Sequence, residues 1–94
     1  MITLQTKFQV PEEVLFRELD SEAVILNIKT GKYYGLNEMG ARIWARLLEK
    51  GSLQAACQAL LEEYDVSEAQ LQADMLQLVE GLAEKGLLTV EPAE

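Results

Sequence analysis

The hydrophobic pattern of the chain changes its period once, near Asn37. Before this residue, apolar and aromatic side chains fall in short runs rich in β-branched residues, which is typical of strands. These runs span residues 14–19, 22–29 and 32–36. Asp20-Ser21 separates the first two runs, and Thr30-Gly31 separates the second from the third, with Gly31 suited to a left-handed turn position. The pattern predicts a three-stranded antiparallel meander over residues 12–36.

After Asn37 the apolar spacing is helical. Asn37 is placed to cap a first helix, which Gly51 ends. The apolar stripe of this helix consists of Gly40, Ile43, Trp44, Leu47 and Leu48. Ser52 is placed to cap a second helix. Its stripe consists of Leu53, Ala56, Cys57, Leu60, Leu61 and Tyr64.

A third helix begins at Ser67, where Ser67 and Gln70 form a capping box, and runs to about Lys85 before Gly86. Its apolar positions spread over about 160°, whereas one packed face needs little more than about 100°. Two interpretations stay open: part of this surface lines a groove, or the helix is wedged between two neighbours and buries two faces.

These elements predict an α+β fold, with a three-stranded antiparallel sheet followed by a three-helix bundle over residues 37–88. At 94 residues, with 49% hydrophobic and 26% charged side chains, we expect one globular domain over residues 1–94. Residues 1–11 and 89–94 carry no clear period, and we expect them to be flexible ends.

Composition argues against catalysis and against nucleic acid. Eight Lys and Arg against sixteen Asp and Glu give 8 − 16 = −8, which repels a polyanion. The chain has no histidine, and its single cysteine, Cys57, lies on a helical apolar stripe typical of a buried hydrophobe. No phosphate-binding loop, dinucleotide fingerprint or metal-spaced cluster occurs. We therefore expect a protein that is not an enzyme and uses no cofactor or metal.

The ends and the hydropathy bear on location. The first residues lack the basic flank and apolar run of a signal peptide, and no segment approaches the ~20 apolar residues of a membrane span. A lone cysteine forms no disulfide within the chain. These features favour the cytoplasm and no membrane partner, and we expect a monomer or a weak dimer.

Five residues are weighed as candidates for binding or for packing: Tyr33, Tyr34, Gly35, Gly40 and Asp74. Gly35 in a strand and Gly40 in a first helical turn each cost about 0.5–1 kcal/mol against alanine, which predicts close backbone approach at both places. Tyr33 and Tyr34 point to opposite faces of their strand, and core packing is favoured for Tyr34. Tyr33 is equally explained as a binding aromatic or an ordinary strand residue. For Asp74, a surface role is slightly favoured over ligand contact.

Four segments of the chain carry a resemblance to a known family: LDSEAVILN at 19–27, TGKYYGLN at 30–37, GARIW at 40–44 and GLL at 86–88. They resemble the PqqD family, the small proteins of pyrroloquinoline quinone biosynthesis and their relatives in lasso peptide and other modified-peptide pathways. The resemblance covers residues 12–88. The Tyr-x-Leu-Asn followed by Gly-Ala-x-Ile-Trp is its most specific part. The Asp20-Ser21 loop departs from the glycine common in the family, which leaves the hairpin's turn type open.

The resemblance implies a RiPP recognition element, a winged-helix-like domain that binds the leader of a ribosomally made precursor peptide by strand addition. It also implies a separate modifying enzyme: a radical-SAM enzyme, or a leader protease with a cyclase. The aromatic strand weakly favours the lasso setting. The implied pairing edge consists of Lys32, Tyr33, Tyr34, Gly35 and Leu36. The implied helical wall consists of Leu71, Asp74, Met75 and Leu78.

The residues themselves agree with strand addition, because the last strand of a meander is a free edge that recruits or repels another strand. Two other functions compete with leader binding. A winged-helix DNA-binding regulator needs a basic recognition helix, yet residues 67–86 contain only Lys85 as a basic residue. An adaptor subunit that uses the same edge on a folded protein partner stays open.

Overall fold

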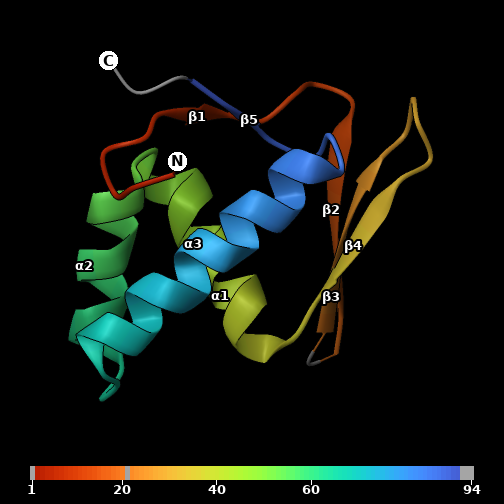
Figure 1. The fold of residues 1–94 in the computed structure, drawn as a ribbon. Coiled ribbons are helices and arrows are strands. Elements are labelled where there is room, and N and C mark those ends of the chain that lie inside the picture. The colour runs from red at the N-terminus through yellow and green to blue at the C-terminus, as the bar shows by residue number, and fades with distance from the viewer. Residues whose placement is uncertain (1, 21, 92–94) are drawn as a thin grey trace.

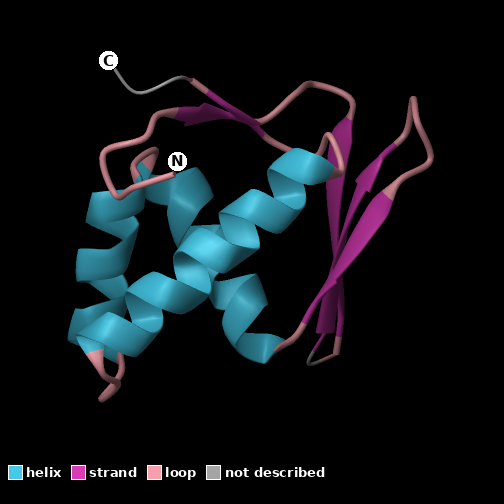
Figure 2. Ribbon diagram, in the orientation of Figure 1, coloured by secondary structure: helices cyan, strands magenta, loops and turns pink. Residues whose placement is uncertain are grey.

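In the computed structural model, which describes residues 2–20 and 22–91, four strands are followed by three helices and a last short strand (Figure 1). The strands are β1 (Phe8–Gln9), β2 (Val14–Leu19), β3 (Glu22–Asn27), β4 (Tyr33–Leu36) and β5 (Thr89–Val90). The helices are α1 (Glu38–Lys50), α2 (Leu53–Glu63) and α3 (Glu68–Glu84). All three helices lie on one side of the three-stranded sheet (Figure 2). The predicted α+β class and the order of sheet before helices are confirmed.

Strands β2, β3 and β4 form the predicted antiparallel meander, in the order β2-β3-β4. The hairpin between β3 and β4 is longer than the predicted Thr30-Gly31 turn, because the side chain of Asn27 organises it. Asn27 Oδ1 accepts hydrogen bonds from the backbone N–H groups of Lys29 (2.9 Å) and Thr30 (3.1 Å). Gly31 takes the expected left-handed conformation, with φ of 77°. Strand β3 therefore stops at Asn27, two residues before the predicted end.

The other hairpin turns at Asp20, which adopts a left-handed φ of 52°. Its neighbour in the predicted turn, Ser21, lies outside the described residues. An acidic or amide side chain tolerates this conformation better than most non-glycine residues. The turn therefore forms without the glycine that the family often has.

The two ends of the chain differ from the prediction. We expected residues 1–11 and 89–94 to be flexible, yet β1 and β5 pair antiparallel, with Phe8 opposite Val90. The Glu91 N–H extends the ladder by donating to the Lys7 carbonyl at 2.9 Å. Phe8 and Val90 also pack against the core. These segments are too short to show a period in the sequence. Residues 1 and 92–94 lie outside the described part of the chain.

Polar caps begin the helices where the sequence predicts them. Asn37, Ser52 and Ser67 accept hydrogen bonds from the N–H groups of Gly40, Ala55 and Gln70. The predicted capping box at Ser67 is only half formed. The side chain of Gln70 does not return to Ser67 but donates from Nε2 to Asp74 Oδ1 at 2.9 Å. Gln70 therefore orients a carboxylate on α3 instead of closing the cap.

The core lies between the sheet and the helices and centres on Trp44, which is 1% exposed. Its ring centroid is 6.5 Å from that of Phe16 on β2. Buried side chains from β3, β4 and the three helices belong to the same core: Ala23, Ile25, Leu36, Ile43, Leu47, Leu53, Leu60, Met75, Val79 and Leu82. The placement of Leu48 on the inner stripe of α1 is wrong, because Leu48 is 51% exposed. Ile43, Trp44 and Leu47 already fill the narrower arc that faces the core.

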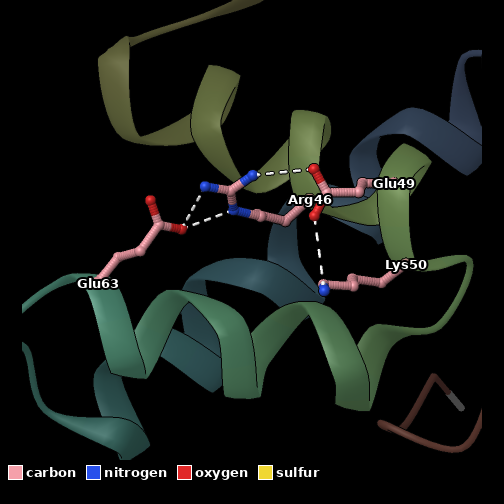
Figure 3. Close-up of polar contacts among 4 residues, drawn as sticks. All are labelled: Arg46, Glu49, Lys50 and Glu63. Atoms are coloured by element: carbon pink, nitrogen blue, oxygen red, sulfur yellow. Dashed lines mark hydrogen bonds and ion pairs between the residues drawn. The ribbon is translucent and has the colours of Figure 1, made fainter.

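A charged cluster ties α1 to the end of α2 (Figure 3). Arg46 Nε donates to Glu63 Oε2 at 2.6 Å, and Arg46 Nη1 lies 3.2 Å from Glu49 Oε2. Lys50 Nζ lies 3.5 Å from Glu49 Oε1. The hydrogen bond to Glu63 is the main cause that raises the pKa of the Arg46 guanidinium. The side chains of Arg46 and Lys50 are thus already paired with carboxylates.

Asn27→Ala should destabilise the fold, because Asn27 is buried and its side chain makes three hydrogen bonds. Besides the two within the hairpin, Nδ2 donates to the Gly86 carbonyl at 3.1 Å. At about 0.5–1.5 kcal/mol for each of the three lost bonds, we expect a loss of about 1.5–4.5 kcal/mol of unfolding free energy, measured by urea denaturation. The control is Thr30→Ala in the same exposed loop, where we expect less than about 0.5 kcal/mol. Equal effects of the two substitutions would contradict the anchoring role.

Candidate functional site

Among the described residues, strand β4 is paired on one side only, with β3. The Asn27 N–H donates to the Lys32 carbonyl at 2.9 Å, which makes these two residues a hydrogen-bonded pair. Hydrogen-bonded pairs alternate in an antiparallel ladder, so the next ones are Ile25 with Tyr34 and Ala23 with Leu36. The N–H and C=O groups of Tyr33 and Gly35 therefore point away from β3, toward the open edge.

Two adjoining cavities follow this edge, and they share Tyr34 and Gly35. We call them together the β4 groove. The first, of about 270 Å³, is lined by Tyr34, Gly35, Leu36, Asn37, Met39, Gly40, Ile43, Asp74, Gln77 and Leu78. The second, of about 580 Å³, is lined by Gly31, Lys32, Tyr33, Tyr34, Gly35 and Lys85. The groove thus runs beside β4, with residues of α3 and of the first turns of α1 as its other walls.

The two tyrosines of β4 lie on opposite faces, as the strand period predicts. Tyr33 is 64% exposed, whereas Tyr34 is half-buried. The Tyr34 ring lies against Gly81 of α3: a Cβ built on Gly81 would approach Tyr34 Cε2 to 2.9 Å. No sequence argument singled out Gly81. Its missing side chain makes room for the ring of Tyr34, a residue that lines both cavities.

The two glycines expected to mark close backbone approach behave differently. At Gly40 the expectation is right, since a Cβ there would lie 3.3 Å from Asn37 Oδ1 and 3.4 Å from the Leu36 side chain. At Gly35 it is wrong for contacts within the chain, because a Cβ would meet nothing within 4 Å. No atom of the described chain requires glycine at position 35. The space beside its backbone is open to a ligand.

Helix α3 supplies the opposite wall, but with fewer of its residues than expected. Asp74 and Leu78 line the first cavity together with Gln77, which sequence reasoning missed. Leu71 and Met75 line neither cavity, because they are 3% and 0% exposed in the core. The wide apolar arc of α3 is thus mostly explained by burial between neighbours. Of the α3 residues, only Asp74, Gln77 and Leu78 border the groove.

Other groove residues also escaped the sequence analysis. Ile43 was assigned to the stripe of the first helix, Asn37 to its cap and Lys85 to the end of the third helix, whereas Met39 was given no role. Asn37 caps α1 with Oδ1 and also lines the first cavity. A signal for Gln77 existed, since positions three residues apart share a helix face with Asp74. No local signal brings Lys85 to β4.

The described residues offer little to a reaction. Burial raises the pKa of the Cys57 thiol, which disfavours the reactive thiolate. Within residues 2–20 and 22–91, no three His, Cys, Asp or Glu side chains converge as a metal site. None of the helices has the length and apolar character needed to cross a bilayer. What the site presents is an open backbone edge beside a partly apolar groove.

Comparisons with known proteins agree with this arrangement. The family model for coenzyme PQQ synthesis protein D (PqqD) matches residues 22–88. Two solved structures resemble the chain, each with 31% sequence identity over 92% of this chain and 99% of the other. One is TbiB1 in complex with the TbiA(beta) leader peptide, with a TM-score of 0.78. The other is lasso peptide synthetase B1 complexed with the leader peptide, with a TM-score of 0.74. No curated protein sequence matches the chain significantly.

The contact between Tyr34 and Gly81 predicts a background-dependent effect of Gly81→Ala on stability. In a Tyr34→Ala protein, the change should raise the unfolding free energy by about 1 kcal/mol, because alanine is the better helix former. With Tyr34 present, the new methyl group displaces the ring, and the gain should shrink or reverse. Urea denaturation of the four proteins measures the coupling. An equal gain in both backgrounds would show that the ring does not need the space at Gly81.

Proposed function

Because the chain belongs to the PqqD family, and because β4 is open on one side, we propose that it binds the leader segment of a ribosomally synthesised precursor peptide as an added strand. The main support is the orientation of the backbone groups of Tyr33 and Gly35. Both residues direct N–H and C=O groups outward beside a groove. Strand addition takes affinity from such groups and specificity from pockets for alternate side chains.

In this proposal the leader pairs along Lys32 to Leu36, with hydrogen bonds at Tyr33 and Gly35. Every second leader side chain points into the β4 groove, where Tyr34, Leu36 and Leu78 offer apolar contact. Asp74 meets a hydrogen-bond donor of the leader. Leu71 and Met75 contribute indirectly, because their burial in the core holds α3 at the distance from β4 that the groove requires.

The proposed role is non-catalytic: the protein holds the leader and presents the attached core peptide to a separate enzyme. The structural neighbour named lasso peptide synthetase B1 supports a lasso-type pathway, in which that enzyme is a leader protease acting with a cyclase. The family name equally describes coenzyme PQQ synthesis, where a radical-SAM enzyme would take this place. The cytoplasm, where precursors are synthesised, is the proposed site of action.

The rival function, DNA binding, finds no support in α3. This helix contains no Lys or Arg, but it carries Glu68, Asp74, Glu80 and Glu84. A helix of this charge repels phosphates, and the chain as a whole carries a net charge of −8. Peptide binding explains the open edge of β4 and the β4 groove, and neither feature requires nucleic acid as the ligand.

The test is a selection of random 14-residue peptides by mRNA display on the folded protein, followed by fluorescence anisotropy of the enriched peptides. We expect linear peptides to be enriched and to protect the Tyr33 and Gly35 amides from hydrogen exchange. Gly35→Pro should weaken binding about tenfold or more, because it removes an outward N–H and obstructs the edge.

The matched control is Glu18→Pro on β2, the opposite edge strand. Residues 15, 17 and 19 of β2 face β3, so the N–H of Glu18 also points outward, and its loss leaves the ladder intact. Glu18→Pro should therefore keep the wild-type affinity. Circular dichroism confirms that both variants fold. Absence of any enriched peptide, or equal loss of affinity in both variants, would rule out strand addition at β4.

A further inference from the structure

The charges along the β4 groove are separated by sign. Lys32, just before β4, and Lys85, at the end of α3, both line the second cavity. Asp74 lines the first cavity, at the other end. No acidic side chain lines the second cavity, and no basic one lines the first. The two cavities meet at Tyr34 and Gly35, so one strand lying along the edge passes from one charge to the other.

The two lysines are available to a ligand. Within residues 2–20 and 22–91, no carboxylate lies within 4.0 Å of either ammonium group, whereas Arg42, Arg46 and Lys50 of α1 all form ion pairs. The α3 dipole favours a cation at Lys85, but it does not explain a second lysine at the same cavity. Two cations that share a site repel each other, and an acidic ligand group relieves that repulsion.

The carboxylate of Asp74 is similarly available. It is half-buried, and its one hydrogen bond among the described residues comes from Gln70 Nε2 to Oδ1, at 2.9 Å. Gln70 is neutral, so it orients the carboxylate without neutralising the charge. A cation or other donor in the first cavity would complete the hydrogen bonding of Asp74.

The spacing of the charges sets the spacing required of the ligand. From Asp74 to Lys85 is 11 residues of helix, about 16 Å at 1.5 Å per residue. From Lys32 to Leu36 along β4 is four residues, about 13 Å. An extended peptide covers this length in four to five residues. Only the even spacing puts both side chains on the face toward the groove.

We infer that the β4 groove selects leaders by charge: an acidic side chain at the Lys32 and Lys85 end, and a basic side chain four positions away at the Asp74 end. This inference rests on the proposed function, since it requires a peptide strand along β4. It adds a rule for the peptide sequence. Hydrogen bonds to the open edge of β4 give affinity in any register of the peptide along the strand. The two charged ends of the groove select one of these registers.

The same display selection tests the rule when it is repeated on two double variants. Lys32→Glu with Lys85→Glu reverses the charge of the second cavity. Lys7→Glu with Lys29→Glu is the matched control, because it also changes the net charge from −8 to −12 but involves no residue of the groove. Lys32→Gln with Lys85→Gln serves if the first variant does not fold, and Asp74→Asn tests the other end.

We expect wild-type protein and the control to enrich peptides with an acidic and a basic residue four positions apart. The Lys32 and Lys85 variants should lose the acidic preference, and Asp74→Asn the basic one. Replacing the acidic residue of an enriched peptide by glutamine should weaken binding to wild-type protein about 2- to 5-fold, with a smaller effect at high salt.

Enriched peptides without this charge spacing would overturn the inference and leave leader binding standing. A preference lost equally in the groove variant and the control would also overturn it, because net charge alone would then be responsible. If no linear peptide is enriched on any protein, the proposed function fails, and the charge rule fails with it.

Discussion

The position of β4 depends on the junction where this strand passes into α1. Leu36, the last residue of β4, is 4% exposed and packs over Gly40, while Asn37 Oδ1 accepts the Gly40 N–H at 2.8 Å. One glycine thus accommodates the strand's end and receives the helix cap. At the other end of the hairpin, Asn27 bonds to the Gly86 carbonyl after α3. These contacts hold β4 at both ends, so it stays in place with β3 as its single neighbouring strand.

This anchoring explains how an unpaired edge persists in so small a domain. An open edge is an aggregation risk, and proteins commonly cover it or blunt it with charge. Here α3 runs beside the edge, and Tyr34 fills the space that Gly81 leaves. The groove beside the edge has lysines at one end and Asp74 at the other, so charge flanks the edge at both ends.

The sequence predicted local features well because their causes are local. The three caps depend on side chains three residues from their partners, and the left-handed turn depends on Gly31 itself. The predictions that were wrong concern side chains for which several possible partners or positions compete. Gln70 bonds Asp74 instead of closing its cap, and Leu48 is exposed because the core-facing arc of α1 was already filled. The β1–β5 pairing escaped prediction because two-residue strands have no period.

The sequence by itself determined the three strands of the meander, the three helices, the edge position of β4 and, through its motifs, the family. The elements follow from periodicity and short-range hydrogen bonding, and the family follows from the motifs. Tertiary structure alone decided which part of α3 borders the groove, that Gly81 accommodates Tyr34, and that Lys32 and Lys85 share one cavity. These relations join residues far apart in the chain. They depend on how α3 crosses the sheet, which packing of the whole core sets and no local pattern encodes.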